Sequence, residues 1–351
     1  MVIGSTATAP PSGGTLHALL RRYADAGDPL SCEPVAQGLL NKGFRLATTR
    51  GSFFLKLYVE PATADSAVIA RQHRATQRLG ALGLPVAPPL PDSDGRTVAE
   101  LDGRRFALYP WIEGRHRDGS ELTTAESRQL GALLGLVHTL LAQVQPAPGE
   151  EPGRPVGGHA GADPQDTYAL IRTLLRRVRD QAPREAFDEL AEYRLVERRA
   201  LLDRHAHRRP PEPDAAEPVT GWVHGDFHPL NLLYREDEPV AIVDWDRLGV
   251  QPRAEEAVRA AAIFFVTPGG TLELDKIRAY ARAYRRAADV PEAELAAAVH
   301  RVWWERLNDF WMLSWRYLRD DRRADPLFPA SSALVVWWTG AYEAVMDAFT
   351  E

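Results

Sequence analysis

Cysteine, lysine and long apolar runs are scarce in this sequence of 351 residues. The single cysteine, Cys32, excludes an internal disulfide framework and is typical of a reducing compartment. No apolar run approaches the roughly 20 residues that a membrane-spanning helix needs, and the N-terminus lacks the basic and then apolar pattern of a secretory signal. We therefore expect a cytoplasmic protein with no membrane partner.

Arginine and lysine are present in very different numbers. Arginine supplies almost all of the basic residues, and the only lysines are Lys42, Lys56 and Lys276. The formal net charge of -6 makes nucleic acid an unfavourable main partner. With 45% hydrophobic residues, the chain is long enough to bury a sizeable core in one or two domains.

The N-terminal third alternates strand and helix patterns behind a flexible tail at residues 1–14. Apolar periodicity predicts helices at about 15–26 and 64–82, the second ending at Gly83. Between and after them, β-branched and aromatic runs with turn residues predict strands within 35–48 and at 53–59, 97–101 and 105–109. Strands and helices in this order predict a small α+β lobe over residues 15–109.

From residue 110 the pattern changes. Residues 110–114 have the composition of a linker, and 115–351 are mainly helical. Thr123 and Glu126 form a capping-box signature that predicts a helix start. Further helical patterns follow at about 166–206 and from about residue 255 to the C-terminus.

One segment carries most of the chemistry. Residues 223–233 have the sequence VHGDFHPLNLL, and AIVDWD follows at 241–246. This places the carboxylate of Asp226, the amide of Asn231 and the carboxylate of Asp244 around a short hairpin. A carboxylate can accept a hydroxyl proton, and carboxylate and amide oxygens suit Mg²⁺. These are the parts that phosphoryl transfer needs, so we predict Asp226 as catalytic base and Asn231 and Asp244 as metal ligands.

The segment resembles the catalytic segment of the aminoglycoside phosphotransferase/choline kinase superfamily. The resemblance implies a two-lobed protein-kinase-like fold of the α+β class. Its small β-rich N-lobe would be followed by a hinge at 110–114 and by a larger helical C-lobe at 115–351, which would carry the catalytic segment 223–246 and the acceptor site. It also implies ATP, or GTP, as donor, Mg²⁺ as cofactor, and a small-molecule hydroxyl as acceptor, in a monomer or homodimer. The acceptor would be an antibiotic, as in resistance enzymes, or a metabolite.

Lys56 is the candidate for the nucleotide phosphates. It interrupts an apolar strand, where a lysine is costly unless it is paired. In protein kinases this lysine pairs with a glutamate on the following helix, but the corresponding position here holds Gln72. Either Gln72 or another carboxylate would then partner Lys56.

Two further segments are assigned to the nucleotide. Residues 37–43 are predicted to cover the phosphates, with Gly38 and Gly43 permitting close backbone approach and Asn41 nearby. The alternative is an ordinary hairpin. By position, Tyr109 and Trp111 match the hinge that the resemblance implies beside the adenine.

The acceptor site is the least specified part of the sequence. Trp304, Trp311 and Trp315 follow helical spacing on one predicted helix, with Glu305 and Asp309 beside them. They form either a core stripe with a solvated acidic edge or an aromatic and acidic wall for a polar or cationic acceptor. The candidate acceptor residues are Asp246, Glu255, Glu256, Glu305, Asp309 and Trp311.

His224 and His228 flank Asp226 and permit two interpretations. They brace the loop, or they bind metal in a phosphoesterase. A non-catalytic nucleotide-binding module is a further alternative, with Gln72 in its favour. The intact set of Asp226, Asn231 and Asp244 favours a phosphotransferase.

Overall fold

The computed structural model describes residues 9–35, 41–59, 65–145, 161–211 and 220–351. They form two compact units. The first unit contains the described residues up to 117 together with 224–226 and 230–248. The second unit contains the described residues of 118–223, 227–229 and 249–351. Asp226, Asn231 and Asp244 therefore lie in the same unit as Lys56. The lobe boundaries expected from the sequence remain a prediction.

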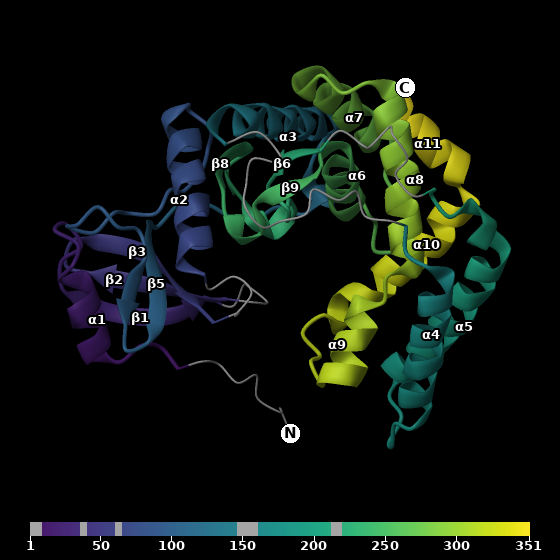
Figure 1. Cartoon of the computed structure of the whole chain (residues 1–351), viewed down its shortest axis with the longest axis horizontal. Helices are drawn as coiled ribbons and strands as arrows, with labels where there is room; N and C mark the ends of the chain where they lie inside the picture. Colours follow the sequence, from purple (N-terminus) through teal and green to yellow (C-terminus); the bar gives the residue numbers. More distant parts are fainter. Residues whose placement is uncertain (1–8, 36–40, 60–64, 146–160, 212–219) are drawn as a thin grey trace. The chain divides into compact units, whose positions relative to one another are not determined.

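A five-stranded antiparallel sheet forms the frame of the first unit (Figure 1). Its strand order is β1-β2-β3-β5-β4. The strands are β1 (Pro29–Val35), β2 (Lys42–Thr48), β3 (Gly51–Tyr58), β4 (Ala99–Leu101) and β5 (Arg104–Pro110). Helices α1 (Gly13–Leu20) and α2 (Ser66–Ala81) complete this part of the unit.

Alternation along β3 decides which side chains meet each helix. Leu55 and Leu57 point to the face covered by α1, in a core with Leu16 and Leu19. Because successive strand residues point to opposite faces, Lys56 and Tyr58 point to the face where α2 packs. The apolar pattern of β3 therefore places its one lysine on the side of the sheet opposite the main core.

The catalytic segment enters the first unit as a hairpin of β7 (Leu232–Arg235) and β8 (Glu238–Ile242). The Ile242 amide donates to the Pro85 carbonyl at 2.7 Å, just after α2. Tyr234 and Arg115 exchange backbone hydrogen bonds at 2.8 and 2.9 Å. These bonds attach the hairpin to the segment between α2 and β4 and to the segment that follows β5.

The second unit is mainly helical. Its helices are α3 (Thr124–Val144), α4 (Pro164–Arg179), α5 (Ala186–His205), α6 (Arg253–Phe264), α7 (Leu274–Ala288), α8 (Glu292–Asn308), α9 (Trp311–Arg319), α10 (Phe328–Gly340) and α11 (Tyr342–Thr350). Strands β6 (Thr220–Val223) and β9 (Gly249–Pro252) pair as an antiparallel ribbon. The predicted capping box of Thr123 and Glu126 is confirmed at the start of α3. Gly131 allows α3 to pack against α7, because a Cβ there would lie 2.1 Å from the Tyr280 carbonyl oxygen.

The helical pattern expected at 166–206 corresponds to two helices, α4 and α5, and one other helical prediction needs correction. The single helix expected to carry Trp304, Trp311 and Trp315 breaks between α8 and α9. Asp309 adopts extended backbone angles, and its carboxylate accepts the Trp311 amide at 2.9 Å. An aspartate that bonds a nearby backbone amide competes with helix continuation, which explains the break.

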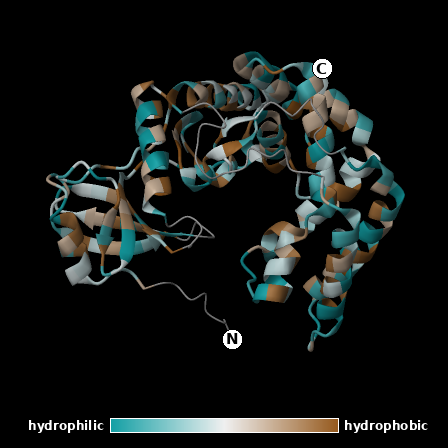
Figure 2. Ribbon diagram, viewed as in Figure 1, coloured by the Kyte–Doolittle hydropathy of each residue, from teal (hydrophilic) through white to brown (hydrophobic). Residues whose placement is uncertain are grey.

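Hydrophobic and hydrophilic residues alternate along the helices of the second unit (Figure 2). On α4, for example, Ile171, Leu174 and Val178 are buried at helical spacing. Within the described residues, no helix is long and apolar enough to cross a bilayer.

Candidate active site

The β7–β8 hairpin brings Asn231 and Asp244 together. Leu232 pairs with Ile242, and one step further the Val243 amide donates to the Asn231 carbonyl at 2.9 Å. Asp244 follows with a left-handed backbone (φ 59°, ψ 64°) that turns the chain away from the strand. The Asn231 side-chain amide donates to the Asp226 carbonyl at 2.7 Å. The hairpin register therefore gathers the three residues that the sequence singled out.

His224 braces the loop that carries Asp226. Its ring is buried, with Nε2 3.0 Å from the Val243 carbonyl oxygen and Nδ1 accepting the Asp226 amide at 3.2 Å. These partners fix the tautomer with hydrogen on Nε2, because a carbonyl can only accept. Gly225 has φ 84°, and a Cβ there would lie 2.2 Å from the Arg247 carbonyl oxygen, so this position requires glycine.

The metal-binding alternative for the histidines fits this geometry poorly. Both ring nitrogens of His224 already have protein partners. His228 is half-buried and belongs to the second unit. Across the residues that the structure describes, no three His, Cys, Asp or Glu side chains form a group suited to a metal. A phosphoesterase built on these histidines therefore has no geometric support here.

Lys56 meets two carboxylates of the segment after the hairpin. Its Nζ lies 2.7 Å from Asp244 Oδ1 and 2.7 Å from Asp246 Oδ1. The Lys56 side chain is only 9% exposed, whereas the Asp244 side chain is 40% exposed. The prediction that Lys56 would need a partner other than a glutamate at position 72 agrees with this geometry.

Burial and charge oppose each other in this cluster. Burial alone lowers the pKa of Lys56, but the carboxylates of Asp244 and Asp246 outweigh it and hold the pKa well above its usual value. Burial raises the pKa of Asp244, yet the Lys56 ammonium group more than compensates and the net pKa is lowered. The pKa of Asp246 is raised, chiefly by burial. One ammonium group thus serves two carboxylates, and it outweighs the effect of burial at Asp244 but not at Asp246.

The residues predicted beside the nucleotide have different environments. Asn41 is buried and bonds Asp246, whereas Gly43 lies within β2 opposite Lys56. A Cβ on Gly43 would lie 2.6 Å from the Phe54 ring, so the glycine makes room for that ring. Gly38 lies outside the described residues. Whether these positions bind phosphate remains a prediction.

The two residues predicted for the hinge, Tyr109 and Trp111, also have different surroundings. Tyr109 belongs to β5, and its hydroxyl lies 3.0 Å from His73 Nε2 and 3.2 Å from the Tyr58 hydroxyl. Trp111 lies beyond β5, with the Arg45 guanidinium 4.8 Å from its ring centroid. The Tyr109 hydroxyl therefore lies on the side of the sheet where α2 packs.

Sequence reasoning missed the role of His73. Its Nδ1 lies 2.7 Å from the Thr97 hydroxyl, and its Nε2 lies 3.1 Å from the Tyr58 hydroxyl. Burial, together with a smaller effect of the nearby Lys56 charge, lowers the pKa of His73 to about 3. Position 73 follows Gln72 on an otherwise ordinary helix, and only the tertiary structure reveals its partners.

The candidate acceptor residues of the second unit are paired within that unit. Arg259 bonds both Glu305 and Glu255 at 2.9 Å. Glu256 is buried and lies 2.7 Å from His138 Nε2. Arg259 and His138 thus contact the three glutamates within the second unit, and whether these residues and Asp309 bind an acceptor remains a prediction.

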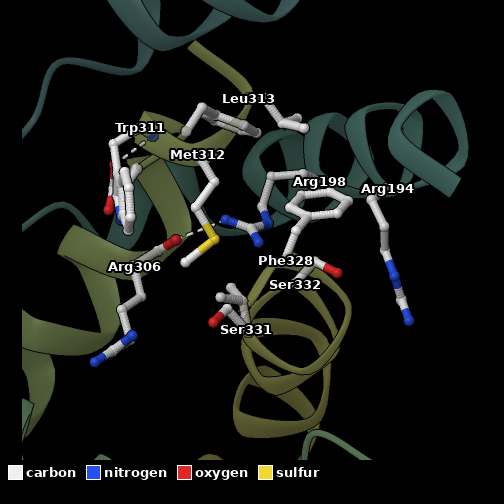
Figure 3. A pocket seen from close by; sticks show the side chains of 12 residues that line it. Arg194, Arg198, Arg306, Trp311, Met312, Leu313, Phe328, Ser331 and Ser332 are labelled. Atoms are coloured by element: carbon white, nitrogen blue, oxygen red, sulfur yellow. Dashed lines mark hydrogen bonds between the residues drawn. The ribbon is translucent and has the colours of Figure 1, made fainter. Parts of the chain in front are cut away.

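Asp309 and Trp311 line a small cavity between α5, α9 and α10 (Figure 3). Arg198 lies at its centre and donates to the Arg306 carbonyl oxygen at 2.6 Å. The cavity is about 50 Å³, whereas sites for small molecules usually measure hundreds of Å³. In this conformation it cannot hold an acceptor larger than a few atoms.

The sheet with its lysine, the hairpin with Asn231 and Asp244, and a second, mainly helical unit define a protein-kinase-like fold. Residues 31–290 match the Phosphotransferase enzyme family (APH), and the chain belongs to this family. The family and the fold class predicted from the sequence are both confirmed.

Similar proteins agree with this assignment. The homoserine kinase of Sinorhizobium medicae (strain WSM419) is 28% identical over 223 residues, which cover 63% of this chain. The match spans 59% of the length of that relative, less than two thirds. Spectinomycin phosphotransferase, solved with ADP and spectinomycin, has a TM-score of 0.65 at 15% identity, covering 96% of this chain and 100% of that one. Amicoumacin kinase, solved with AMP-PNP and Ca²⁺, has a TM-score of 0.63 at 16% identity, covering 94% and 91%.

Proposed function

We propose that this protein transfers the γ-phosphoryl group of ATP to a hydroxyl of a small molecule. One observation carries the proposal: Asp226, Asn231, Asp244 and Lys56 lie in one compact unit, joined through the β7–β8 hairpin. Family membership supports the same reaction. Structures with ADP or an ATP analogue among the proteins of similar fold are consistent with a nucleotide donor.

Asp226 accepts the proton of the attacking hydroxyl. Its carboxylate is about one-third exposed, and the Arg247 guanidinium lies 3.9 Å away. The carboxylate is therefore reachable while its backbone is held by His224 and Asn231. A base held in one orientation can align the acceptor oxygen for attack on phosphorus. Lys56 binds the phosphates and offsets charge that develops on them.

Asn231 and Asp244 fit a magnesium ion. An amide oxygen and a carboxylate are hard ligands of the kind that Mg²⁺ prefers. Asp244 is exposed enough to accept such a ligand, and Lys56 supplies only one charge to two carboxylates. When bound, Mg²⁺ would screen the phosphate charges. The chain contributes the position of these two ligands through the hairpin register.

We propose a hydroxy amino acid or amino alcohol as the acceptor class. The relative from Sinorhizobium medicae is a homoserine kinase, and homoserine carries an amino group, a carboxylate and a primary hydroxyl. An antibiotic acceptor is the second candidate. It rests on spectinomycin phosphotransferase and amicoumacin kinase, whose likeness to this chain is one of fold.

The test is a panel of acceptors with ATP and Mg²⁺, read by ADP release and by phosphorus NMR of the product. The panel should include homoserine, choline, 1-amino-2-propanol, spectinomycin and a hydroxyl-free control, norvaline. We expect product formation with at least one amino alcohol or hydroxy amino acid and none with norvaline. ADP release that is equal with and without any acceptor would contradict the proposal, since it indicates hydrolysis. Product from spectinomycin alone would favour the antibiotic acceptor.

A further inference from the structure

Lys56 needs a counter-charge that its neighbouring helix cannot supply. The side chain is nearly buried, and an isolated buried ammonium group is strongly unfavourable. Helix α2 packs on the same face of the sheet, but its sequence SAVIARQHRATQRLGA contains no aspartate or glutamate. The charge must therefore come from another element, and the two carboxylates in contact are Asp244 and Asp246.

These two carboxylates differ in how they are held. Asp246 is 13% exposed, and both of its oxygens have partners. Oδ1 accepts from Lys56 at 2.7 Å, and Oδ2 accepts from Asn41 Nδ2 at 2.5 Å. The Asp246 backbone carbonyl accepts from Gln72 Nε2 at 2.7 Å. Asp246 is thus enclosed and tied to β3, α2 and the chain just before β2, while Asp244 remains open to ligands.

We propose that Asp246 is the fixed charge partner of Lys56 and a positioning residue of the nucleotide site, rather than an acceptor residue. It does for Lys56 what a glutamate on α2 would do, and Gln72 contributes by holding the Asp246 backbone. Asn41 completes the arrangement, because its Oδ1 also accepts the Val59 amide at 3.0 Å. Lys56 therefore stays in place even when Asp244 is engaged by another ligand. The role in nucleotide binding rests on the proposed function; the pairing itself does not.

The Asp246→Asn variant tests the role in nucleotide binding. It keeps the side-chain shape and removes the charge. We expect ATP affinity, measured by calorimetry, to fall at least tenfold both with Mg²⁺ and with EDTA, while the KM for the acceptor stays within twofold. A loss seen only with Mg²⁺ would make Asp246 a metal ligand and overturn the proposal. A rise confined to the acceptor KM would return Asp246 to the acceptor site and overturn it equally.

Transferring the carboxylate from position 246 to position 72 tests whether Asp246 acts through its charge on Lys56. In the Asp246→Asn background, Gln72→Glu places a carboxylate on α2 at the position whose side chain reaches the backbone of residue 246, and we expect it to recover at least threefold of the lost ATP affinity. Gln77→Glu in that background is the matched control, with the same charge change on the same helix. In the wild-type background Gln72→Glu should weaken ATP binding, because its carboxylate faces the Asp246 carbonyl. Recovery by Gln72→Glu no greater than by Gln77→Glu would contradict the proposal.

A stability cycle without nucleotide separates this inference from the proposed function. Lys56→Met, Asp246→Asn and the double variant are compared by Tm. We expect the double variant to lose clearly less than the sum of the single losses, because a lone buried charge is worse than none. Additive losses would refute the pairing. A non-additive cycle in a protein that binds no ATP would refute the proposed function and leave the pairing intact.

Discussion

The two units treat their acidic residues differently. In the first unit, Lys56 is shared by Asp244 and Asp246, and the Asp244 side chain remains 40% exposed. In the second unit, Arg259 forms ion pairs with the buried Glu255 and with the exposed Glu305. Glu256 is buried beside His138. The comparison shows that acidic residues that look alike in the sequence differ in their exposure and in their hydrogen-bonding and charged partners. Asp244 and Glu305 are both accessible, and each shares one cation with a second carboxylate. The β7–β8 hairpin places Asn231, a second oxygen ligand, beside Asp244, and this addition suits Asp244 to a ligand cation.

The largest expected effect in this comparison comes from Asp226→Asn. The change preserves shape and removes proton acceptance, so kcat should fall by about 10²–10⁴. ATP affinity should stay within twofold, because the variant retains Lys56 and Asp244. Steady-state kinetics and calorimetry check the two halves. Asp237→Asn is the control, since its exposed carboxylate lies on the hairpin turn and pairs with Arg117. A kcat within threefold of the wild type would show that Asp226 is not the base.

Asp244→Ala should have the next largest effect. Removing the accessible carboxylate should abolish the Mg²⁺-dependent part of ATP binding, because a charged ligand is lost. Asn231→Ala should weaken the Mg²⁺ dependence less, since only a neutral oxygen is removed. Calorimetric titrations of ATP at several Mg²⁺ concentrations measure both. Unchanged Mg²⁺ dependence in Asp244→Ala would place the metal site elsewhere and remove the contrast between the units.

His73 gives the first unit a specific pH dependence. Burial lowers its folded-state pKa to about 3, from 6.5 for an ordinary histidine. The unfolded state therefore binds the proton first, and stability is lost as the pH falls below 6.5. Between pH 7 and pH 5 this amounts to about 2 kcal/mol in the free energy of unfolding.

Urea unfolding of wild type and His73→Gln at both pH values measures this loss. The variant should lose about 2 kcal/mol less than the wild type on acidification. His17→Gln, at an exposed position of α1, is the control and should follow the wild type. Equal pH dependence in His73→Gln and wild type would contradict the assignment.

The smallest effect is expected in the second unit. Glu305→Gln removes one exposed partner of Arg259, and such pairs contribute roughly 0–1 kcal/mol. The acceptor KM should change less than twofold, because Arg259 and Glu255 stay paired. Kinetics at low and physiological salt would measure it. A severalfold rise in acceptor KM that shrinks with salt would instead support the acidic acceptor wall expected from the sequence.

Local sequence patterns were enough for much of the fold and for the choice of catalytic residues. The apolar alternation around Lys56, the capping box at Thr123 and the HGDFHPLN segment each depend on residues close in the chain. These patterns depend on the side-chain period of a strand, on the hydrogen bonds of a helix cap and on the chemical type of the ligands. All three are local properties of the sequence, so the family resemblance could be recognised from them.

Pairing over long distances in the chain was decided only by the tertiary structure. The partner of Lys56 is 190 residues away at Asp246, and the helix break at Asp309 depends on one side-chain bond that competes with helix continuation. The sequence leaves Glu255, Glu256 and Glu305 as candidates for an acidic wall, yet in the fold Arg259 bonds both Glu255 and Glu305, and His138 lies beside Glu256. The sequence by itself determined which residues can do phosphoryl chemistry. Which carboxylates remain accessible for it depended on packing, because burial and pairing are properties of the folded chain.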